Sequence, residues 1–208
     1  MSAKVVLLAT RSEGKLRELK GILRDAGLEG ITLDDAGIPH SAEEETIECY
    51  ETFEENALAK ARYFHRLSGM PAMADDSGLC VESLGGAPGV HSRRYSGRTD
   101  LTGQAVDDAN NEKLQRDLAG APNTMASYTC AAAFVDGPNE QVVMGRTHGW
   151  IISDPRGDNG FGYDPYFFSR ELGMTFGEAG LDAKAEVSHR GRAFRALMAA
   201  LRDRAGTL

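Results

Sequence analysis

The segment Ala74-Asp75-Asp76-Ser77-Gly78 directs the interpretation of the whole chain, because it follows a short apolar run at 70–74. Two adjacent carboxylates repel each other and are therefore unfavourable in a hydrophobic core. The same pair suits a site for a divalent cation, which prefers oxygen ligands. Neighbouring side chains of a strand point to opposite faces, so one acid can hold a metal while the other anchors the strand. We expect a strand that ends at these acids and places a ligand at its carboxyl end. The alternative is a solvated turn.

The composition limits the classes of molecule that the protein can bind. The chain has 208 residues, and 31 acidic against 23 basic side chains give a net charge of −8. This charge argues against nonspecific binding to nucleic acid. Cys49, Cys80 and Cys130 are widely scattered, as expected of reduced thiols. No signal peptide or membrane span is visible, and we expect one cytoplasmic domain over residues 1–208, with neither nucleic acid nor membrane as a partner.

The amino-terminal segment reads as strand, loop and helix. Residues 5–9 are continuously apolar, and a helix with one apolar face follows the loop Thr10-Arg11-Ser12-Glu13-Gly14-Lys15. We expect this helix to end at Gly27. Amide groups at the start of such a helix, together with Lys15, favour a phosphate. The loop is not a Walker A motif, since it lacks the leading glycine and has Leu16 in place of Ser or Thr. An ordinary turn with a solvated lysine is the alternative.

Residues 28–51 are expected to be irregular and acid-rich. One of Glu44, Glu45 and Glu48 could reach a metal at Asp76, although charge runs are usually solvated. Thr52 and Glu55 form a capping-box pattern that predicts a helix running to about residue 67.

The second half combines a hairpin with a glycine-rich loop. We expect a helix over 105–119 and two antiparallel strands over 128–135 and 141–152. In the loop at 155–165, Phe161 and Tyr163 alternate with glycines, which favours open ring faces for a flat heterocycle, and Asp164 could accept from ring N–H groups. A loop pinned by buried aromatic rings is the alternative.

A cationic segment completes the pattern. Lys184, Ser188, His189 and Arg190 lead a last helix, where donors and the helix dipole favour an anion or a carbonyl oxygen. Lys15 for phosphates, Asp76 with a glutamate for magnesium, aromatic rings for a base and cations for a base oxygen together describe a nucleoside triphosphate with its metal.

Six motifs in register resemble one known family. They are Thr10-x-x-x-x-Lys15, Thr52-Phe53-Glu54-Glu55-Asn56-Ala57, Ala74-Asp75-Asp76-Ser77-Gly78-Leu79, Gly85-Gly86-Ala87-Pro88-Gly89, Asn159-Gly160-Phe161-Gly162-Tyr163-Asp164-Pro165 and Ser188-His189-Arg190-Gly191. They are similar to those of the inosine/xanthosine triphosphate pyrophosphatases, house-cleaning enzymes for non-canonical purine nucleotides. The resemblance implies an elongated α/β fold with a mixed sheet flanked by helices, two lobes and a central active-site cleft. It further implies a homodimer that hydrolyses ITP, dITP and XTP to the monophosphate and pyrophosphate with Mg²⁺.

The resemblance also assigns roles. Asp76 is the proton acceptor and binds the metal together with Glu48. The substrate-binding residues are Thr10, Arg11, Ser12, Glu13, Gly14, Lys15, Ser77, Phe161, Gly162, Tyr163, Asp164, Lys184, His189 and Arg190. The family usually has Asn where this chain has Ser12, and the acidic segment before Thr52 is longer, which leaves Glu44 and Glu45 open as metal ligands.

Other functions fit parts of the pattern. A non-catalytic nucleotide sensor would keep the same pockets without turnover. A relative acting on modified pyrimidine nucleotides would share the scaffold. A phosphorelay receiver domain is disfavoured, because the loop around Phe161 has no role there.

Overall fold

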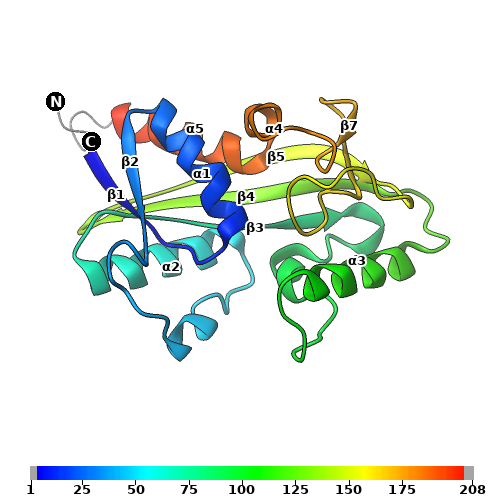
Figure 1. The fold of residues 1–208 in the computed structure, drawn as a ribbon, viewed down its shortest axis with the longest axis horizontal. Helices are drawn as coiled ribbons and strands as arrows, with labels where there is room; N and C mark the ends of the chain where they lie inside the picture. The colour runs from blue at the N-terminus through cyan, green and yellow to red at the C-terminus, as the bar shows by residue number, and fades with distance from the viewer. Residues whose placement is uncertain (1–3, 204–208) are drawn as a thin grey trace. The chain divides into compact units, whose positions relative to one another are not determined.

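The computed structural model describes residues 4–203, which divide into two compact units (Figure 1). Within the described range, unit 1 comprises residues 4–76, 130–145 and 189–203, and unit 2 comprises 77–129 and 146–188. No helix in residues 4–203 is long and apolar enough to cross a membrane.

The strands form one mixed seven-stranded sheet in the order β2-β1-β3-β4-β5-β6-β7. Their bounds are β1 Lys4–Leu8, β2 Leu28–Thr32, β3 Ala72–Val81, β4 Met125–Asp136, β5 Asn139–Ile151, β6 Phe167–Ser169 and β7 Met174–Thr175. Strand β1 pairs in parallel with β2 and β3, whereas β6 pairs antiparallel with β5 and β7. Two residues connect β4 to β5, which confirms the predicted hairpin. The α/β prediction with a mixed sheet flanked by helices is confirmed.

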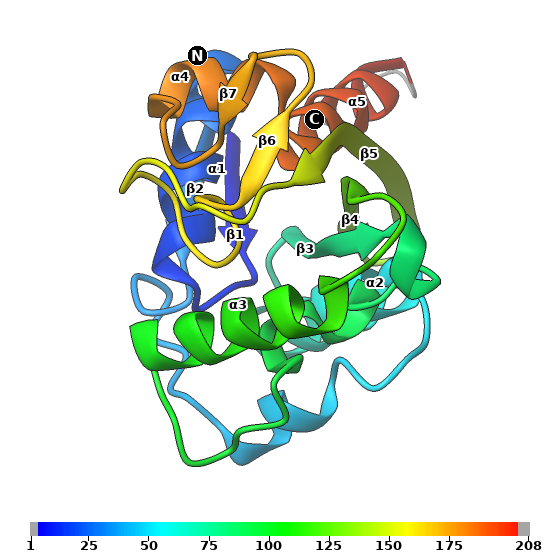
Figure 2. The ribbon, with the colours of Figure 1, turned by 90° about the vertical axis from the view of Figure 1, so that its right-hand side faces the viewer.

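The main helices are α1 Glu13–Asp25, α2 Phe53–Ser68, α3 Gln104–Leu118, α4 Leu181–Val187 and α5 His189–Asp203. In unit 1, α1 and α5 lie on one side of the sheet and α2 on the other (Figure 1). The core under α1 and α5 includes Leu19, Leu23, Phe194 and Leu197, all at most 1% exposed. In unit 2, α3 buries Leu114 and Leu118 in a second core with several aromatic rings (the green helix in Figure 2).

The predicted helix ends agree with the structure. Thr52 caps α2, and its hydroxyl accepts from the Glu55 N–H at 3.2 Å. Ala26 caps α1 at its carboxyl end, and Gly27 follows in the left-handed region at φ +77°.

Three sequence predictions are wrong. Strand β3 does not end at the acids but continues through Asp75 and Asp76 to Val81. Residues 28–51 are not wholly irregular, because β2 extends the sheet there and a 3₁₀ turn covers Ala42–Thr46. Lys184 lies on the separate helix α4 rather than at the head of the last helix.

Gly78 explains why β3 resembles a turn in sequence. A Cβ atom at Gly78 would lie 2.2 Å from the Gly89 carbonyl oxygen and 2.4 Å from the Ser92 hydroxyl. The glycine therefore permits close approach of the 89–92 segment inside unit 2. It marks a packing contact within a strand, not the end of that strand.

Candidate active site

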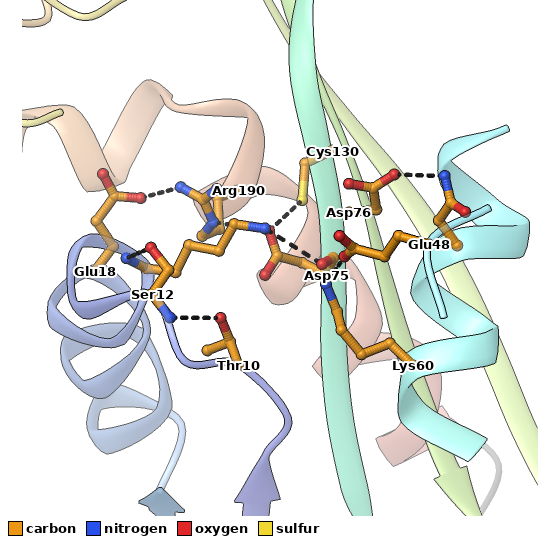
Figure 3. A network of polar contacts seen from close by, with 11 residues as sticks. Thr10, Ser12, Glu18, Glu48, Lys60, Asp75, Asp76, Cys130 and Arg190 are labelled. Carbon is orange, nitrogen blue, oxygen red and sulfur yellow. Dashed lines mark hydrogen bonds and ion pairs between the residues drawn. The ribbon is translucent and has the colours of Figure 1, made fainter. Parts of the chain in front are cut away.

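The two acids of β3 face opposite sides of the sheet, as predicted (Figure 3). Asp75 is directed toward Arg190 and Glu18, and Asp76 toward α2 and Glu48. Both carboxylates are buried, at 0% and 7% exposure for the two residues. Unit 1 therefore has two separate acidic environments on one short stretch of strand.

Asp75 is the centre of a buried ion-pair network. Its Oδ2 lies 3.0 Å from the Lys15 ammonium and 3.1 Å from Arg190 Nε, and Arg190 Nη1 donates to Glu18. Burial alone would raise the pKa of Asp75, but the charges of Lys15 and Arg190 outweigh it and hold the pKa far below its usual range. Asp75 therefore stays ionised and fixes the position of Lys15.

Asp76 has the opposite electrostatic balance. Burial raises the pKa of its carboxyl group, and the charge of Glu48 adds to the rise, while Lys15 and Lys60 oppose it. Asn56 Nδ2 donates to Asp76 Oδ2 at 3.0 Å. A carboxylate of raised basicity, held in place by an amide, has the properties of a general base.

The structure separates the acidic candidates of the 42–51 segment. Glu48 lies on the Asp76 side of β3 and pairs with Lys60 (Figure 3). Burial alone would raise the pKa of Glu48, but the charges of Lys60 and Lys15 hold it below its usual value. Glu44 instead accepts from the Arg11 guanidinium at 2.9 and 3.1 Å, and Glu45 is exposed. Of the three, Glu48 is the one that electrostatics couples to Asp76.

The Asn56 side chain connects the Asp76 carboxylate with the segment that contains Glu48. This side chain on α2 is 1% exposed. Its Oδ1 accepts from the Tyr50 N–H at 2.9 Å, and its Nδ2 donates to the Tyr50 carbonyl at 3.1 Å as well as to Asp76. One amide therefore positions both acids.

The loop from Thr10 to Lys15 leads into α1 as predicted. The Ser12 hydroxyl accepts from the Lys15 N–H at 3.4 Å, so Ser12 caps the helix, and the Thr10 hydroxyl accepts from the Ser12 N–H at 3.2 Å. Arg11 bonds to Asp34, Glu44 and the Ile38 carbonyl, and so anchors the acidic segment. Phosphate binding at the amino end of α1, beside Lys15, stays a prediction.

Unit 2 holds the glycine-rich loop around a buried ion pair. The Lys184 ammonium donates to Asp164 Oδ2 at 2.6 Å, and both side chains are at most 4% exposed. The same oxygen accepts from the Phe161 N–H at 2.8 Å, and the ammonium lies 5.3 Å from the centroid of the half-buried Phe161 ring. A Cβ atom at Gly160 would lie 2.1 Å from Asp164 Oδ2, so the glycine makes room for this contact.

The expectation of two open rings is wrong for Tyr163. This residue is 5% exposed, belongs to the core of unit 2, and donates its hydroxyl to the Ser92 carbonyl at 2.7 Å. The Tyr163 ring therefore anchors the loop, and Phe161 is the ring that can stack on a ligand.

The predicted site residues fall into two groups. Unit 1 contains Thr10, Arg11, Ser12, Glu13, Gly14, Lys15, Glu48, Asp76, His189 and Arg190, and unit 2 contains Ser77, Phe161, Gly162, Tyr163, Asp164 and Lys184. His189 and Arg190 are 3% and 2% exposed. The ion pairs of Arg190 give it a structural role in unit 1, and its contact with a base stays a prediction.

Sequence reasoning missed three residues of the unit 1 network, Glu18, Asn56 and Lys60. Each lies on an amphipathic helix, and Glu18 and Asn56 are directly followed by the buried Leu19 and Ala57. A polar side chain within a buried helical face is unusual unless it has a partner. That pattern was the available signal.

The donor set suits a cation that arrives with its substrate. No group of three or more His, Cys, Asp or Glu side chains within residues 4–203 could hold a metal by itself. Asp76 and Glu48 supply two hard oxygen ligands on one side of β3. Mg²⁺ typically binds through one or two carboxylates and completes its shell with waters and substrate phosphates, so these residues fit it.

Comparison with known proteins shows the family. The Ham1 family model matches residues 6–200. The chain is 45% identical over 204 residues to a dITP/XTP pyrophosphatase of Geobacter sulfurreducens, covering 97% of this chain and 96% of the relative. It is 44% identical over 200 residues to a dITP/XTP pyrophosphatase of Ralstonia nicotianae, covering 95% and 96%. A HAM1 protein structure from Coxiella burnetii superposes with a TM-score of 0.81 at 34% identity, covering 96% of this chain and 99% of that one. The chain therefore belongs to the Ham1 family.

Proposed function

We propose that this protein hydrolyses the non-canonical purine nucleotides ITP, dITP and XTP to the monophosphate and pyrophosphate, with Mg²⁺ as cofactor. The observation that carries the proposal is the pair Asp75 and Asp76 on opposite faces of β3, one neutralised by cations and one of raised basicity. Membership of the Ham1 family and relatives named dITP/XTP pyrophosphatase support it.

The residues of unit 1 act on the triphosphate. Lys15 and the backbone N–H groups at the start of α1 bind phosphate oxygens, and Asp76 and Glu48 would hold the metal. A bound Mg²⁺ would neutralise phosphate charge and lower the pKa of a water. Asp76 accepts the proton of the water that attacks the α-phosphorus. The bond from the α-phosphorus to the bridging oxygen breaks, and pyrophosphate leaves with that electron pair.

The residues of unit 2 recognise the base. Phe161 stacks on the purine ring, and Lys184 donates toward an oxygen at position 6. Adenine has an amino donor at that position, which would leave donors facing a donor. Such a mismatch costs about 1–3 kcal/mol, or about 5- to 150-fold in kcat/KM. ITP and XTP are therefore expected to be better substrates than ATP.

A pyrophosphate-release panel tests this function. ITP, XTP, dITP, GTP, ATP and dUTP are assayed with and without Mg²⁺. We expect release from ITP, XTP and dITP that needs the metal and exceeds release from ATP by the factor above. No release from any purine nucleotide would favour the alternative, a nucleotide sensor without turnover. Preferred release from dUTP would point to a pyrimidine enzyme instead.

The assembly and location are proposals of the same kind. We propose a cytoplasmic homodimer that binds neither nucleic acid nor membrane. The net charge of −8 supports the absence of nucleic-acid binding, and none of the three cysteines is in a disulfide. Light scattering of the purified protein, which should give twice the chain mass of 22.4 kDa, tests the dimer.

A further inference from the structure

Helix α3 contacts the glycine-rich loop through a pair of side chains one turn apart. Asp107 Oδ2 accepts from the Gly162 N–H at 2.9 Å, and Asn111 Nδ2 donates to the Gly162 carbonyl at 3.0 Å. Residues four apart share one face of a helix, so the two side chains bind both polar groups of one residue. We refer to Asp107 and Asn111 as the α3 clamp.

The clamp acts on a residue with an unusual backbone. Gly162 has φ +63°, in the left-handed region, although a Cβ atom there would meet nothing within 4 Å. Glycine is therefore needed for conformation rather than for space. The left-handed turn directs the N–H to Asp107 and the carbonyl to Asn111. Phe161 directly precedes this residue in the chain.

The environment of the clamp differs from that of an ordinary helix surface. Asn111 is 6% exposed, and Asp107 is half-buried, whereas the adjacent Asp108 is exposed and accepts from Gln104 within its own helix. Among residues 4–203, the Asn111 Oδ1 atom is buried without a hydrogen-bond partner. A buried unsatisfied oxygen costs stability, whereas the bond from Asn111 Nδ2 to the loop is favourable.

From these contacts we propose that Asp107 and Asn111 are positioning residues for base recognition: the α3 clamp fixes the Gly162 backbone and so orients the Phe161 ring against the purine. Other bonds hold the loop as well. The Phe161 N–H donates to Asp164 Oδ2, the Phe161 carbonyl accepts from the Asp164 N–H at 3.3 Å, and the Tyr163 hydroxyl donates to the Ser92 carbonyl. On the amino side of Phe161, the Asn159 N–H donates to the Gly177 carbonyl at 2.9 Å. The clamp bonds to both backbone polar groups of Gly162, the residue that directly follows the ring. Asp107 contributes more than Asn111, because a bond to a carboxylate is stronger than one between neutral groups.

The inference rests on the proposed function and predicts a specific kinetic signature. Stacking on a base is equal in the ground state and in the transition state, so its loss raises KM and leaves kcat nearly unchanged. We expect Asp107→Ala to raise KM for ITP by about 10-fold with kcat within about twofold of the parent. The affinity for inosine monophosphate should fall by a similar factor, and the affinity for pyrophosphate with Mg²⁺, which lacks a base, should not change.

Three further variants make the test specific. Asp107→Asn keeps an oxygen that accepts from the Gly162 N–H, so its KM for ITP should be close to that of the parent. Asp108→Ala removes an exposed acid from the same helix and should behave as the parent. Asn111→Leu removes the unsatisfied oxygen together with the donor, so it should raise KM by about threefold without lowering the melting temperature.

The outcomes separate the inference from the function beneath it. An unchanged KM and unchanged inosine monophosphate affinity in Asp107→Ala, while the parent hydrolyses ITP, would overturn the clamp. An equal loss of inosine monophosphate and pyrophosphate affinity would also overturn it, since it would show a general structural role. If Asp107→Ala does not fold, the KM of Asn111→Leu decides. A parent protein that hydrolyses no purine nucleotide would overturn the proposed function instead.

Discussion

Asp76→Asn is expected to lower kcat for ITP by about 10²- to 10⁴-fold while the protein stays folded. The loss follows from removal of the group that accepts the proton of the attacking water. The amide has nearly the same shape as the carboxylate, and its oxygen can still accept from Asn56 Nδ2. Steady-state kinetics with ITP and Mg²⁺ measures the loss.

The stability of this variant separates the chemistry from folding. The pKa of Asp76 is raised above its unfolded value by burial, so its charged form costs stability at neutral pH. This cost decreases as the pH falls through the folded-state pKa and is gone below the unfolded-state pKa. Asp76→Asn lacks this cost and should melt at the same temperature as the parent or higher. Glu54→Gln, an exposed acid in the first turn of α2, serves as the matched control with unchanged kcat. Near-parental turnover by Asp76→Asn would remove Asp76 from the catalytic role.

Arg190→Met is expected to destabilise unit 1 by about 3–5 kcal/mol. The substitution leaves Asp75 and Glu18, at 0% and 7% exposure, as buried carboxylates with one of their cations removed. Breaking one partner of a buried ion pair costs that much because the remaining charge is uncompensated. Urea unfolding at pH 7, where Asp75 is ionised in the parent, measures the change.

A double variant tests the physical reason. Adding Glu18→Gln to Arg190→Met removes one of the stranded charges and should recover part of the lost stability. No recovery, or a loss below about 1 kcal/mol in the single variant, would contradict the network.

The single variant Arg190→Met also tests whether Arg190 takes part in base recognition. If Arg190 acts through Asp75 and Lys15, activity falls equally for ITP and ATP, whereas a direct base contact would change their ratio.

Sequence patterns predicted the elements that depend on local signals. The apolar run at 5–9, the Thr52 cap and Gly27 each act over a few residues, and the structure has the expected strand, helix start and helix end there. Strand β2 was missed because its five residues include a glycine and a glutamate, and its stability comes from pairing with β1.

The acidic pair shows where local signals mislead. Asp, Ser and Gly in succession favour a turn, but the partners of Asp75 and Asp76 outweigh that preference. Arg190 and Asp75 are 115 residues apart in sequence, and Arg190 and Glu18 are 172 apart. No local pattern identifies such partners, and the same limit hid the role of Tyr163, whose hydroxyl contacts a carbonyl 71 residues away.

The candidate site was predictable in its residue types and less so in their roles. The order of the motifs predicted that Asp76, Lys15 and the loop around Phe161 belong to one nucleotide site. The choice of Glu48 over Glu44 needed the Arg11 contacts, which only the fold supplies. The structure likewise shows that Ser12 caps α1, and its contact with phosphate stays a prediction.

The most direct test of the account is the fate of the water oxygen during turnover. ITP is hydrolysed by the parent protein with Mg²⁺ in ¹⁸O-labelled water, and mass spectrometry locates the label in the products. Attack at the α-phosphorus, with Asp76 as proton acceptor, predicts ¹⁸O in inosine monophosphate and unlabelled pyrophosphate. Label in the pyrophosphate, or release of inosine diphosphate with labelled phosphate, would contradict it.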